Sequence, residues 1–239
     1  MSKSIKTQAI ALLKQAYGPD AEFRDGQLEA IVSVVEKEKT LVVQKTGWGK
    51  SIVYFIATKI LRQNGAGPTI IVSPLLALMK NQVDSALVLG INAVTINSDN
   101  RNEWDDIYDN LDTYDAIIVS PERLSNEEFI EYLADICDIQ LFVVDEAHSI
   151  SDWGHDFRPD YQRIVKLLGN FPDNIAILGT TATANNRVIT DIKKQLGDNL
   201  VVVRGDLIRE RLAIQINPYQ NREERLAWLA QSLYSDEKL

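Results

Sequence analysis

Short, continuous apolar runs alternate along this chain with longer amphipathic segments. The runs are rich in Val and Ile, as buried parallel strands are, and they predict strands at 41–43, 69–72, 93–96, 115–119, 141–144, 175–178, 201–203 and 212–216. Helices are predicted at 1–14, 28–38, from 52, at 73–89, 101–111, 127–135, 159–168, up to 196, and at 221–234. This alternation indicates an α/β fold with a mostly parallel sheet and helices on both faces.

Two carboxylates, Asp145 and Glu146, directly follow the apolar run at 141–144. Ligands of open α/β sheets gather beyond the carboxyl ends of the strands, so a metal and a general base are expected here. A polar and aromatic segment follows, up to Pro159, where the next helix is predicted to begin. Taken alone, the same pattern also fits a strand end capped by a solvated acidic turn.

A glycine-rich segment, 44–51, lies between the first predicted strand and the helix that begins near Ile52. Gly47 and Gly49 allow the backbone to turn successive N–H groups inward, and the helix N-terminus adds a partial positive charge. Lys50 is predicted to reach the phosphates of a nucleoside triphosphate, and the Ser51 hydroxyl to ligate Mg²⁺. Gln44 stands where the full pattern has Gly, so an accidental glycine turn is the alternative; the preceding strand and the carboxylate pair favour a phosphate site.

Two predicted strands end in Ser-Pro, at Ser73-Pro74 and Ser120-Pro121. Each serine can cap a helix whose first position is the proline, which is a purely structural role. Alternatively, these helix N-termini line one edge of the sheet and grip phosphates of a nucleic-acid strand. The pattern leaves both interpretations open.

The composition limits the class of protein. The chain has 239 residues with 45% apolar content, enough for a sizeable core, and a single cysteine, Cys137, which excludes an internal disulfide framework and fits a reducing interior. No apolar run approaches the ~20 residues of a membrane span. The expected location is therefore intracellular: cytoplasmic (nucleoid) in a bacterium, or nuclear in a eukaryote.

The net charge of -9 argues at first against a nucleic-acid partner. The acidity is local, however. Residues 99–160 hold 18 Asp and Glu against three Arg, a net of -15, so the rest of the chain carries +6. A basic surface elsewhere in the molecule is compatible with these numbers.

With the glycine-rich segment, the Asp145-Glu146 pair and Thr181-Ala182-Thr183 in place, the sequence resembles superfamily 2 helicases, and within them the RecQ family of DNA helicases. The resemblance covers residues 17–192 and rests on 23–27, 46–51, 72–80, 120–123, 145–148 and 181–183. Its most specific part is Trp153-Gly154-His155-Asp156-Phe157-Arg158-Pro159, which is similar to that family's aromatic-rich loop. It implies a RecA-like three-layer sandwich, the fold of P-loop NTPases.

The resemblance also implies roles for individual residues. Ser51 and Asp145 would hold Mg²⁺, and Lys50, Asp145 and Glu146 would be catalytic, Glu146 by deprotonating the attacking water. ATP would be bound by Arg24, Gln27, Lys45, Thr46, Gly47, Trp48, Gly49, Lys50 and Ser51, with Arg24 and Gln27 at the adenine. The coupling residues would be His148, Thr181 and Thr183. DNA would be contacted by Ser73, Lys80, Arg123, Trp153, His155, Phe157 and Arg158; a core role for Trp153 and Phe157 within their loop is the alternative.

The expected organisation is N-terminal helices carrying the adenine motif at 1–38, a RecA-like domain at 39–217, and a helix with the start of a linker at 218–239. ATP and Mg²⁺ are the expected cofactors. The expected partners are single-stranded and duplex DNA and a second RecA-like domain, without which we expect weak or no ATP hydrolysis and no unwinding; movement from 3′ to 5′ is implied by the resemblance. The competing functions are a DEAH-box RNA helicase or remodelling ATPase, and a non-catalytic nucleotide-gated binding module.

Overall fold

The computed structural model of the chain describes residues 2–126, 129–130, 133, 139–151, 159–168, 174–197, 199–206, 218 and 221–234. The chain divides into two compact units, residues 1–207 and 208–239. The second unit contains one described helix, α9 (Arg222–Tyr234), where a helix was predicted. The predicted strand at 212–216 and most of the predicted helix at 127–135 lie outside the described residues.

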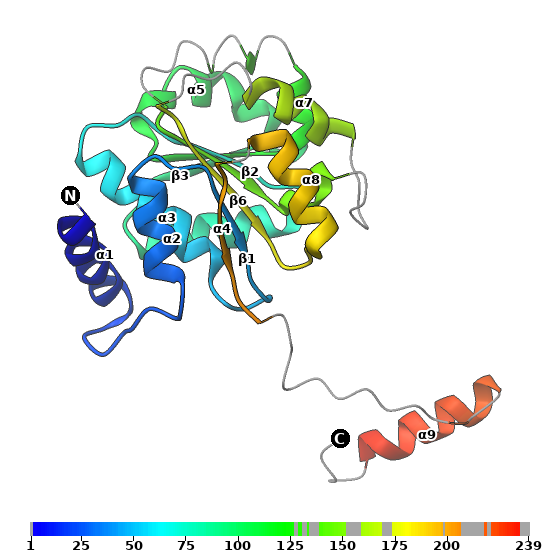
Figure 1. Cartoon of the computed structure of the whole chain (residues 1–239). Helices are drawn as coiled ribbons and strands as arrows, with labels where there is room; N and C mark the ends of the chain where they lie inside the picture. Colours follow the sequence, from blue (N-terminus) through cyan, green and yellow to red (C-terminus); the bar gives the residue numbers. More distant parts are fainter. Residues whose placement is uncertain are drawn as a thin grey trace. The chain divides into compact units, whose positions relative to one another are not determined.

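A seven-stranded sheet forms the centre of the first unit (Figure 1). Its strands are β1 (Thr40–Val43), β2 (Thr69–Val72), β3 (Ala93–Ile96), β4 (Ala116–Val119), β5 (Leu141–Asp145), β6 (Ala176–Thr181) and β7 (Val201–Arg204). Their order is β3-β4-β2-β5-β6-β1-β7, and every neighbouring pair is parallel. Since all strands run the same way, the loops that follow β1, β2, β4, β5 and β6 meet at one edge of the sheet.

Helices cover both faces of the sheet and enclose two hydrophobic cores (Figure 1). One face is covered by α1 (Ser2–Tyr17), α2 (Gln27–Val35), α3 (Lys50–Gln63) and α4 (Leu76–Val88). The other is covered by α5 (Trp104–Tyr108), α7 (Pro159–Leu168) and α8 (Asn186–Leu196). Successive strand residues point to opposite cores, as Leu41 and Val42 do, so both faces of each central strand are apolar. The predicted three-layer arrangement is therefore present.

The predicted helix at 101–111 is shorter than expected. Only α5 is α-helical there, between the 3₁₀ helices η1 (Ser98–Glu103) and η2 (Leu111–Thr113). Asn97 caps η1 by accepting from the backbone N–H of Asp99, and Asn100 has a non-helical backbone inside η1. Asn and Asp side chains compete for backbone hydrogen bonds, which explains why this Asp- and Asn-rich segment is broken.

Neither Ser-Pro pair begins an α-helix in the predicted way. Ser73 continues the strand ladder, since its N–H donates to Val119 O at 2.9 Å, and α4 begins only at Leu76. Ser120 precedes a 3₁₀ helix, η3 (Pro121–Ser125), without a capping hydrogen bond from its side chain. The interpretation as a helix cap is therefore wrong for Ser73, whereas Ser120 occupies the N-cap position of η3 with Pro121 in the first turn but makes no capping bond through its side chain.

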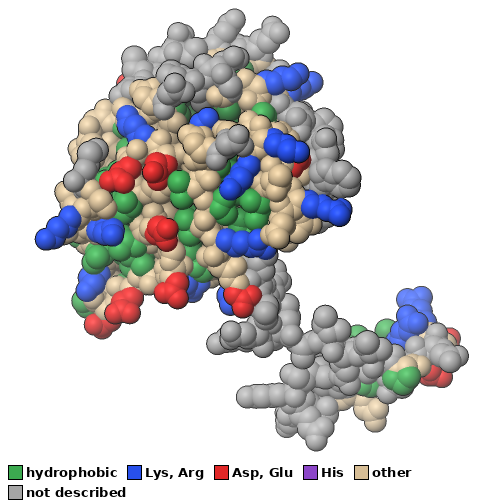
Figure 2. Space-filling view, in the orientation of Figure 1, with side chains coloured by type: hydrophobic (Ala, Val, Ile, Leu, Met, Phe, Trp, Pro, Cys, Tyr) green, Lys and Arg blue, Asp and Glu red, His purple; other side chains and the backbone are tan. Residues whose placement is uncertain are grey.

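The surface shows that the acidic charge is uneven. On the face in Figure 2, basic side chains gather on the side of α8, and acidic ones lie mainly on the side of α1 and α2. The basic residues of α8 include Arg187, Lys193 and Lys194. Within the described part of the chain, no helix combines the length and apolar character needed to cross a membrane.

Candidate nucleotide-binding site

The strand order brings the predicted phosphate segment and the carboxylate pair to one cavity. β6 lies between β5 and β1, so the segment after β1 and Asp145 at the end of β5 are separated by one strand. The cavity has a volume of about 320 Å³. It is lined by Thr46, Gly47, Gly49, Lys50, Ser51, Tyr54, Leu78, Asn81, Gln82, Ser85, Asp145 and Glu146. The sequence predicted most of this lining; α4 supplies the four residues from 78 to 85.

The phosphate segment has the backbone that its glycines permit. Gly47 has φ 82° and Gly49 has φ 93°, both in the left-handed region that favours glycine. Gly49 precedes α3, so the helix N-terminus faces the cavity. The ammonium group of Lys50 donates to Gln44 O at 3.1 Å, which holds this cation at the loop.

Gln27 and Arg24 support the phosphate segment from the side of α2. The amide Nε2 of Gln27 donates to Trp48 O at 2.9 Å and to Gly49 O at 3.3 Å, while its Oε1 accepts from the N–H of Arg24. The Arg24 guanidinium donates to Gly47 O. Gln27 is only 2% exposed, so an adenine contact stays a prediction that requires its amide to leave the loop carbonyls.

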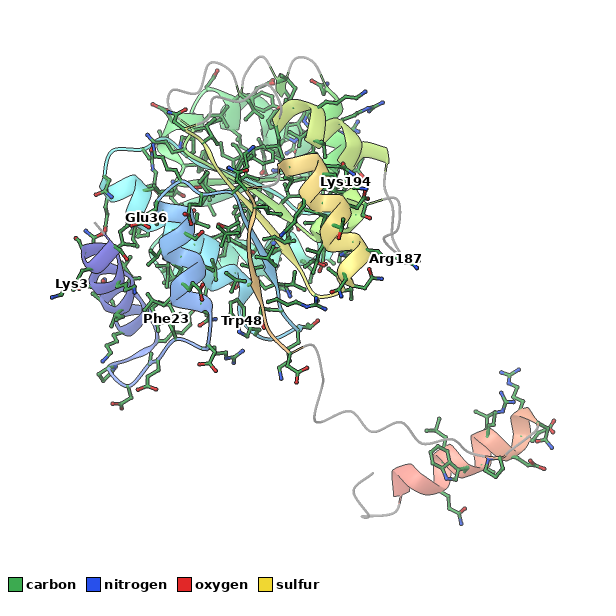
Figure 3. All side chains as sticks on the ribbon, in the orientation of Figure 1. Lys3, Phe23, Glu36, Trp48, Arg187 and Lys194 are labelled. Atoms are coloured by element: carbon green, nitrogen blue, oxygen red, sulfur yellow. The ribbon has the colours of Figure 1, made fainter. Side chains whose placement is uncertain are left out.

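Trp48, the bulky residue of the segment, is buried beneath the loop that precedes α2 (Figure 3). Its Nε1 donates to Asp25 O at 3.2 Å. A side chain at Gly26 would approach both Trp48 and Val203 of β7, and Gly26 also has φ 83°. Trp48 therefore packs as a core residue and holds the loop before α2 in place. It is not among the residues that line the cavity.

Gln44 departs from the usual glycine and is also buried. It packs against Gly205, which follows β7: a Cβ built at Gly205 would lie 2.7 Å from Cδ of Gln44 and closer still to both amide atoms. The backbone continues the ladder at this point, since Gly205 N–H donates to Val43 O at 3.1 Å. The start of the phosphate segment thus touches the chain as it leaves β7.

Asp145 accepts hydrogen bonds at both carboxylate oxygens. Thr180 donates to Oδ1 at 2.5 Å and the N–H of Glu146 at 3.1 Å, and Gln82 Nε2 donates to Oδ2 at 3.1 Å. Burial raises the pKa of Asp145 above its ordinary value of 3.8, and the charge of Glu146 adds to this effect. The hydrogen bonds and the charge of Lys50 act in the opposite direction on this pKa. The hydrogen bonds thus hold the carboxylate in place, although its burial disfavours the charged form.

Tyr54 of α3 extends this network below the cavity. Its hydroxyl is fully buried and accepts from the same Gln82 amide at 3.1 Å. Burial raises the pKa of Tyr54 well above 10.0, and the nearby charge of Asp145 adds to it, while hydrogen bonds with Gln82 and Ser51 lower it. Tyr54 therefore stays a neutral phenol that connects Ser51 to Asp145.

Glu146 begins a chain of contacts that leads to the end of β6. Its Oε2 lies 3.1 Å from His148 Nδ1, and the same nitrogen lies 3.0 Å from Thr181 Oγ1, which accepts from the N–H of Thr183 at 3.1 Å. An ionised carboxylate can only accept, so the contact with Glu146 requires a proton on His148 Nδ1. Glu146 has φ 51°, a left-handed conformation held at the start of η4 (Ala147–Ile150). The three predicted coupling residues are thus joined to the predicted base.

The residues predicted to bind DNA do not form one described group. Ser73 is fully buried, so a DNA contact through its side chain stays a prediction that requires a change of conformation. Lys80 is exposed on α4. Arg123 stacks on the ring of Trp104 and lines a different cavity. Trp153, His155, Phe157 and Arg158 lie outside the described residues.

Three residues of the network were missed in the sequence: Tyr54, Gln82 and Thr180. Gln82 lies just beyond the Leu78-Met79-Lys80 segment and one helical turn from Leu78, so its side chain points to the same face of α4. Thr180 directly precedes Thr181, and strand alternation would have placed it on the opposite face. Helical spacing gave a signal for Gln82; nothing in the sequence paired it with Asp145.

Comparisons with known proteins show the family of this chain. The family model described as DEAD/DEAH box helicase matches residues 24–192. The chain is 40% identical over 225 residues to the ATP-dependent DNA helicase RecQ of Bacillus subtilis, covering 90% of this chain and 36% of the relative. It is 39% identical over 183 residues to the RecQ-like DNA helicase BLM of Xenopus laevis, covering 73% of this chain and 13% of the relative. The predicted resemblance is confirmed.

The fold is also found among solved structures. The Hef helicase domain of Pyrococcus furiosus matches with a TM-score of 0.57 and 19% identity, over 76% of this chain and 38% of that chain. This likeness confirms the predicted RecA-like α/β fold. The chain spans 30–36% of the length of three bacterial RecQ relatives, those of Bacillus subtilis, Pasteurella multocida and Haemophilus influenzae.

Proposed function

Because this chain belongs to the DEAD/DEAH box helicase family, we propose that it is the ATP-hydrolysing motor domain of a RecQ-type DNA helicase. The observation that carries the proposal is the cavity in which the phosphate segment and Lys50 face Asp145 and Glu146. The similarity to relatives named as ATP-dependent DNA helicases supports DNA as the substrate. In this proposal, hydrolysis of ATP drives movement along a single strand and separation of the duplex.

The nucleotide phosphates are held by the glycine-rich segment. The glycine-rich segment and the N-terminus of α3 border the cavity, and a helix N-terminus favours anions. Lys50 exchanges its bond with Gln44 O for phosphate oxygens. Lys45 and Thr46 belong to the same segment, while Gln27 and Arg24 fix its shape from the side of α2.

Ser51 and Asp145 would hold Mg²⁺. Hydroxyl and carboxylate oxygens are the ligands this ion prefers, and Oδ2 of Asp145 accepts one hydrogen bond, which leaves it a lone pair. No group of three or more His, Cys, Asp or Glu that could hold a metal occurs among the described residues. Mg²⁺ with nucleotides commonly uses one or two carboxylates plus phosphates and waters, so this donor set fits it. When bound, the ion would neutralise part of the phosphate charge.

Glu146 is placed to act on the attacking water. It lines the cavity next to Asp145, and its contact with His148 fixes the orientation of its carboxylate. Accepting a proton from water is the step we assign to Glu146. Movement of His148 and Thr181 would then report the state of the nucleotide to the strand-binding edge.

The complete helicase is proposed to contain more than this chain. The relatives are about three times as long, which leaves room for a second RecA-like domain that completes the ATP site. We further propose 3′-to-5′ movement, and DNA contacts from the segment that contains Trp153 and Arg158. Stacking of bases on aromatic rings suits a grip that is independent of sequence.

The first test separates an enzyme from a nucleotide-gated binding module. Glu146→Gln should keep ATP affinity and reduce hydrolysis by at least about 100-fold, because general bases contribute about 10²–10⁴-fold. Radiolabelled ATP retained on the full-length variant, beside turnover by the full-length wild-type protein, gives both numbers. Hydrolysis that is equal in the two proteins would remove Glu146 from the mechanism.

The second test concerns the nucleic acid. ATP turnover of the full-length protein should rise with single-stranded DNA, and Arg158→Ala should abolish the rise while basal turnover remains. Stimulation by RNA in place of DNA would instead favour an RNA helicase or a remodelling ATPase, and would show that the proposed substrate is wrong.

A further inference from the structure

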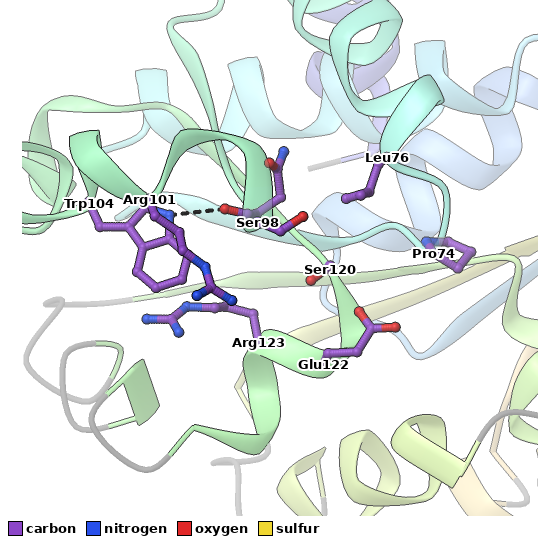
Figure 4. A pocket seen from close by; sticks show the side chains of 9 residues that line it. Pro74, Leu76, Ser98, Arg101, Trp104, Ser120, Glu122 and Arg123 are labelled. Carbon is purple, nitrogen blue, oxygen red and sulfur yellow. Dashed lines mark hydrogen bonds between the residues drawn. The ribbon is translucent and has the colours of Figure 1, made fainter.

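Helix α4 borders two cavities at the carboxyl edge of the sheet. Leu76, in its first turn, lines a second cavity of about 390 Å³ (Figure 4). Gln82, further along the helix, lines the nucleotide cavity, and the two cavities share no lining residue. The buried residues of α4 are Met79, Gln82 and Ala86, so Gln82 is the polar one among them. A buried amide beside the nucleotide cavity calls for a reason other than packing.

The Gln82 amide is turned so that it donates both of its described hydrogen bonds. Its Nε2 donates to Asp145 Oδ2 and to the hydroxyl oxygen of Tyr54, each at 3.1 Å. Its Oε1 is buried and has no hydrogen-bond partner in the described part of the chain. A buried acceptor without a donor is unfavourable, but the opposite orientation of the amide would place Oε1 against the carboxylate. The two donated bonds therefore determine how this side chain is oriented.

These bonds connect the two residues that would hold the metal. Tyr54 is hydrogen-bonded to Ser51, one turn before it on α3, and Gln82 joins Tyr54 to Asp145. A hydroxyl that ligates a metal through its oxygen must direct its hydrogen elsewhere, and the phenol oxygen of Tyr54 can accept it. The link thus joins α3, α4 and the end of β5, which are far apart in the sequence.

The link is buried along its length. Tyr54 is 2% exposed and Gln82 is 7% exposed. The other carboxylate oxygen of Asp145 is held by the hydroxyl of Thr180 at 2.5 Å. Because protein interiors are closely packed and deform little, the chain fixes the spacing between the Ser51 hydroxyl and the Asp145 carboxylate. A cation has to fit this spacing.

A fixed spacing distinguishes Mg²⁺ from Ca²⁺. Mg²⁺ takes six ligands in near-ideal octahedral geometry at about 2.0–2.1 Å, whereas Ca²⁺ takes 6–8 oxygens at about 2.3–2.6 Å in flexible arrangements. Selectivity between the two ions therefore depends on the number of ligands and on their freedom to move. One hydroxyl and one carboxylate that cannot move apart favour the smaller ion, which completes its shell with phosphate oxygens and waters.

We propose that Gln82 and Tyr54 are positioning residues that make the nucleotide site selective for Mg²⁺ over Ca²⁺, by holding Asp145 and Ser51 at a fixed spacing. Neither residue contacts the ion or the reacting atoms. The inference rests on the proposed function, since it takes Ser51 and Asp145 as the residues that hold the metal. It assigns a role in metal specificity to α4, which no motif in the sequence suggested.

The test is nucleotide binding by the full-length protein with different ions. The probe is mant-AMP-PNP, a fluorescent ATP analogue that is not hydrolysed, titrated in saturating Mg²⁺, in saturating Ca²⁺ and in EDTA. The ratio of Kd in Ca²⁺ to Kd in Mg²⁺ measures the selectivity without any turnover. The wild-type protein should bind the analogue more tightly in Mg²⁺ than in Ca²⁺.

Gln82→Met keeps the length and approximate volume of the side chain and removes its donors. Loss of a residue that orients a metal ligand costs about 10- to 100-fold in metal affinity, so Kd in Mg²⁺ should rise by about this factor, toward its value in EDTA. Kd in Ca²⁺ should rise less, so the ratio falls. Tyr54→Phe breaks only the connection to Ser51 and should lower the ratio too. Since the two residues act as one link, the double variant should lose no more selectivity than Gln82→Met alone.

Two further variants control for general damage to the fold. Leu76→Ala changes the same helix at the second cavity. Thr58→Val removes a buried hydrogen bond of 2.8 Å to Thr69, further along α3 than Tyr54. Both should keep the wild-type ratio even where they lower the urea midpoint, because a loss of stability weakens binding in Mg²⁺ and in Ca²⁺ alike.

The outcomes separate this inference from the proposed function. Selectivity for Mg²⁺ that Gln82→Met and Tyr54→Phe both retain, or a Kd that rises equally in the two ions, overturns the inference and keeps the helicase assignment. A wild-type protein that needs a metal but does not distinguish Mg²⁺ from Ca²⁺ has the same meaning. Equal wild-type binding in EDTA and in Mg²⁺ overturns both the inference and the assignment of Ser51 and Asp145 to a metal. Should Gln82→Met not fold, the ratio in Tyr54→Phe decides alone.

Discussion

Replacement of Asp145 by Asn should stabilise the nucleotide-free protein although it removes a predicted catalytic residue. The change removes a buried charge and keeps the shape of the side chain. The new carbonyl oxygen can still accept from Thr180 and from the N–H of Glu146. The new NH₂ would face the Gln82 donor, but Oε1 of Gln82 is buried and has no partner. A flip of the Gln82 amide therefore presents an acceptor to the new NH₂ and to the hydroxyl of Tyr54.

The sign of the effect follows from the pKa of Asp145. Burial places its pKa in the folded protein above the ordinary value of 3.8 that holds in the unfolded chain. Between these two values the folded state binds more protons than the unfolded state, so stability falls as pH rises through this window and the loss is complete above it. The loss is about 1.4 kcal/mol for each tenfold difference in proton affinity. At pH 7.5, above the window, we expect Asp145→Asn to raise the free energy of unfolding by this amount, and each gain of about 1 kcal/mol corresponds to a rise of roughly 2–4 °C in Tm for a chain of this size.

The measurement is urea unfolding of the nucleotide-free protein at several pH values from 8 to 4.5. The advantage of the Asn variant should be largest near neutral pH and should shrink as the pH falls toward 3.8, because the wild-type carboxyl becomes protonated in the folded state over this range. Asp115→Asn is the control, because Asp115 pairs with Arg62 at 3.0 Å and its loss should destabilise the protein. An Asp145→Asn protein that is less stable at every pH would show that the hydrogen bonds of the carboxylate outweigh its burial.

Three further predictions concern the phosphate segment and its coupling. Gln27→Ala leaves two loop carbonyls without donors, which costs about 1–3 kcal/mol, so the affinities for ATP and for GTP should both fall roughly 5- to 100-fold in nucleotide titrations. A loss of affinity confined to ATP would contradict a role of Gln27 limited to the loop. Gly205→Ala should lower the free energy of unfolding by about 1–3 kcal/mol in urea unfolding, and adding Gln44→Ala should restore most of that loss in the double variant. Additive effects of the two substitutions would contradict the contact between Gln44 and Gly205. Thr181→Val should lower the ratio of DNA-stimulated to basal ATP turnover roughly 2- to 30-fold, because the loss of the contact with His148 removes about 0.5–2 kcal/mol of coupling free energy. An equal fall in both rates would contradict a coupling role.

The sheet was predictable because the sequences of parallel strands that are buried on both faces are continuous apolar runs. Each of the seven described strands lies where such a run predicted it. β6 is the strand whose end was misjudged: it extends through Thr180 and Thr181, beyond the predicted end at residue 178. These polar residues belong to the strand because Asp145 and His148 satisfy their hydroxyls, and such partners cannot be read from local sequence.

The site was predictable only where its residues are close in sequence. The phosphate segment and the Asp145-Glu146 pair are local patterns, and their chemistry follows from residue type. The contacts between distant residues are not local: Gln82 on α4 donates to Asp145 at the end of β5, and Arg123 stacks on Trp104 although β4 separates them in the sequence. The strand order β5-β6-β1 decides which loops meet, and single-sequence patterns do not encode that order.

The departure of the phosphate segment from its usual pattern is explained by a glycine elsewhere in the chain. Gln44 replaces a glycine, and the room for its side chain is supplied by Gly205 after β7. This substitution therefore moves the need for a glycine from the segment to a neighbouring element. It follows that a side chain should be tolerated at 205 once residue 44 is small, whereas at Gly26, with φ 83°, a side chain stays strained whatever residue stands at 48.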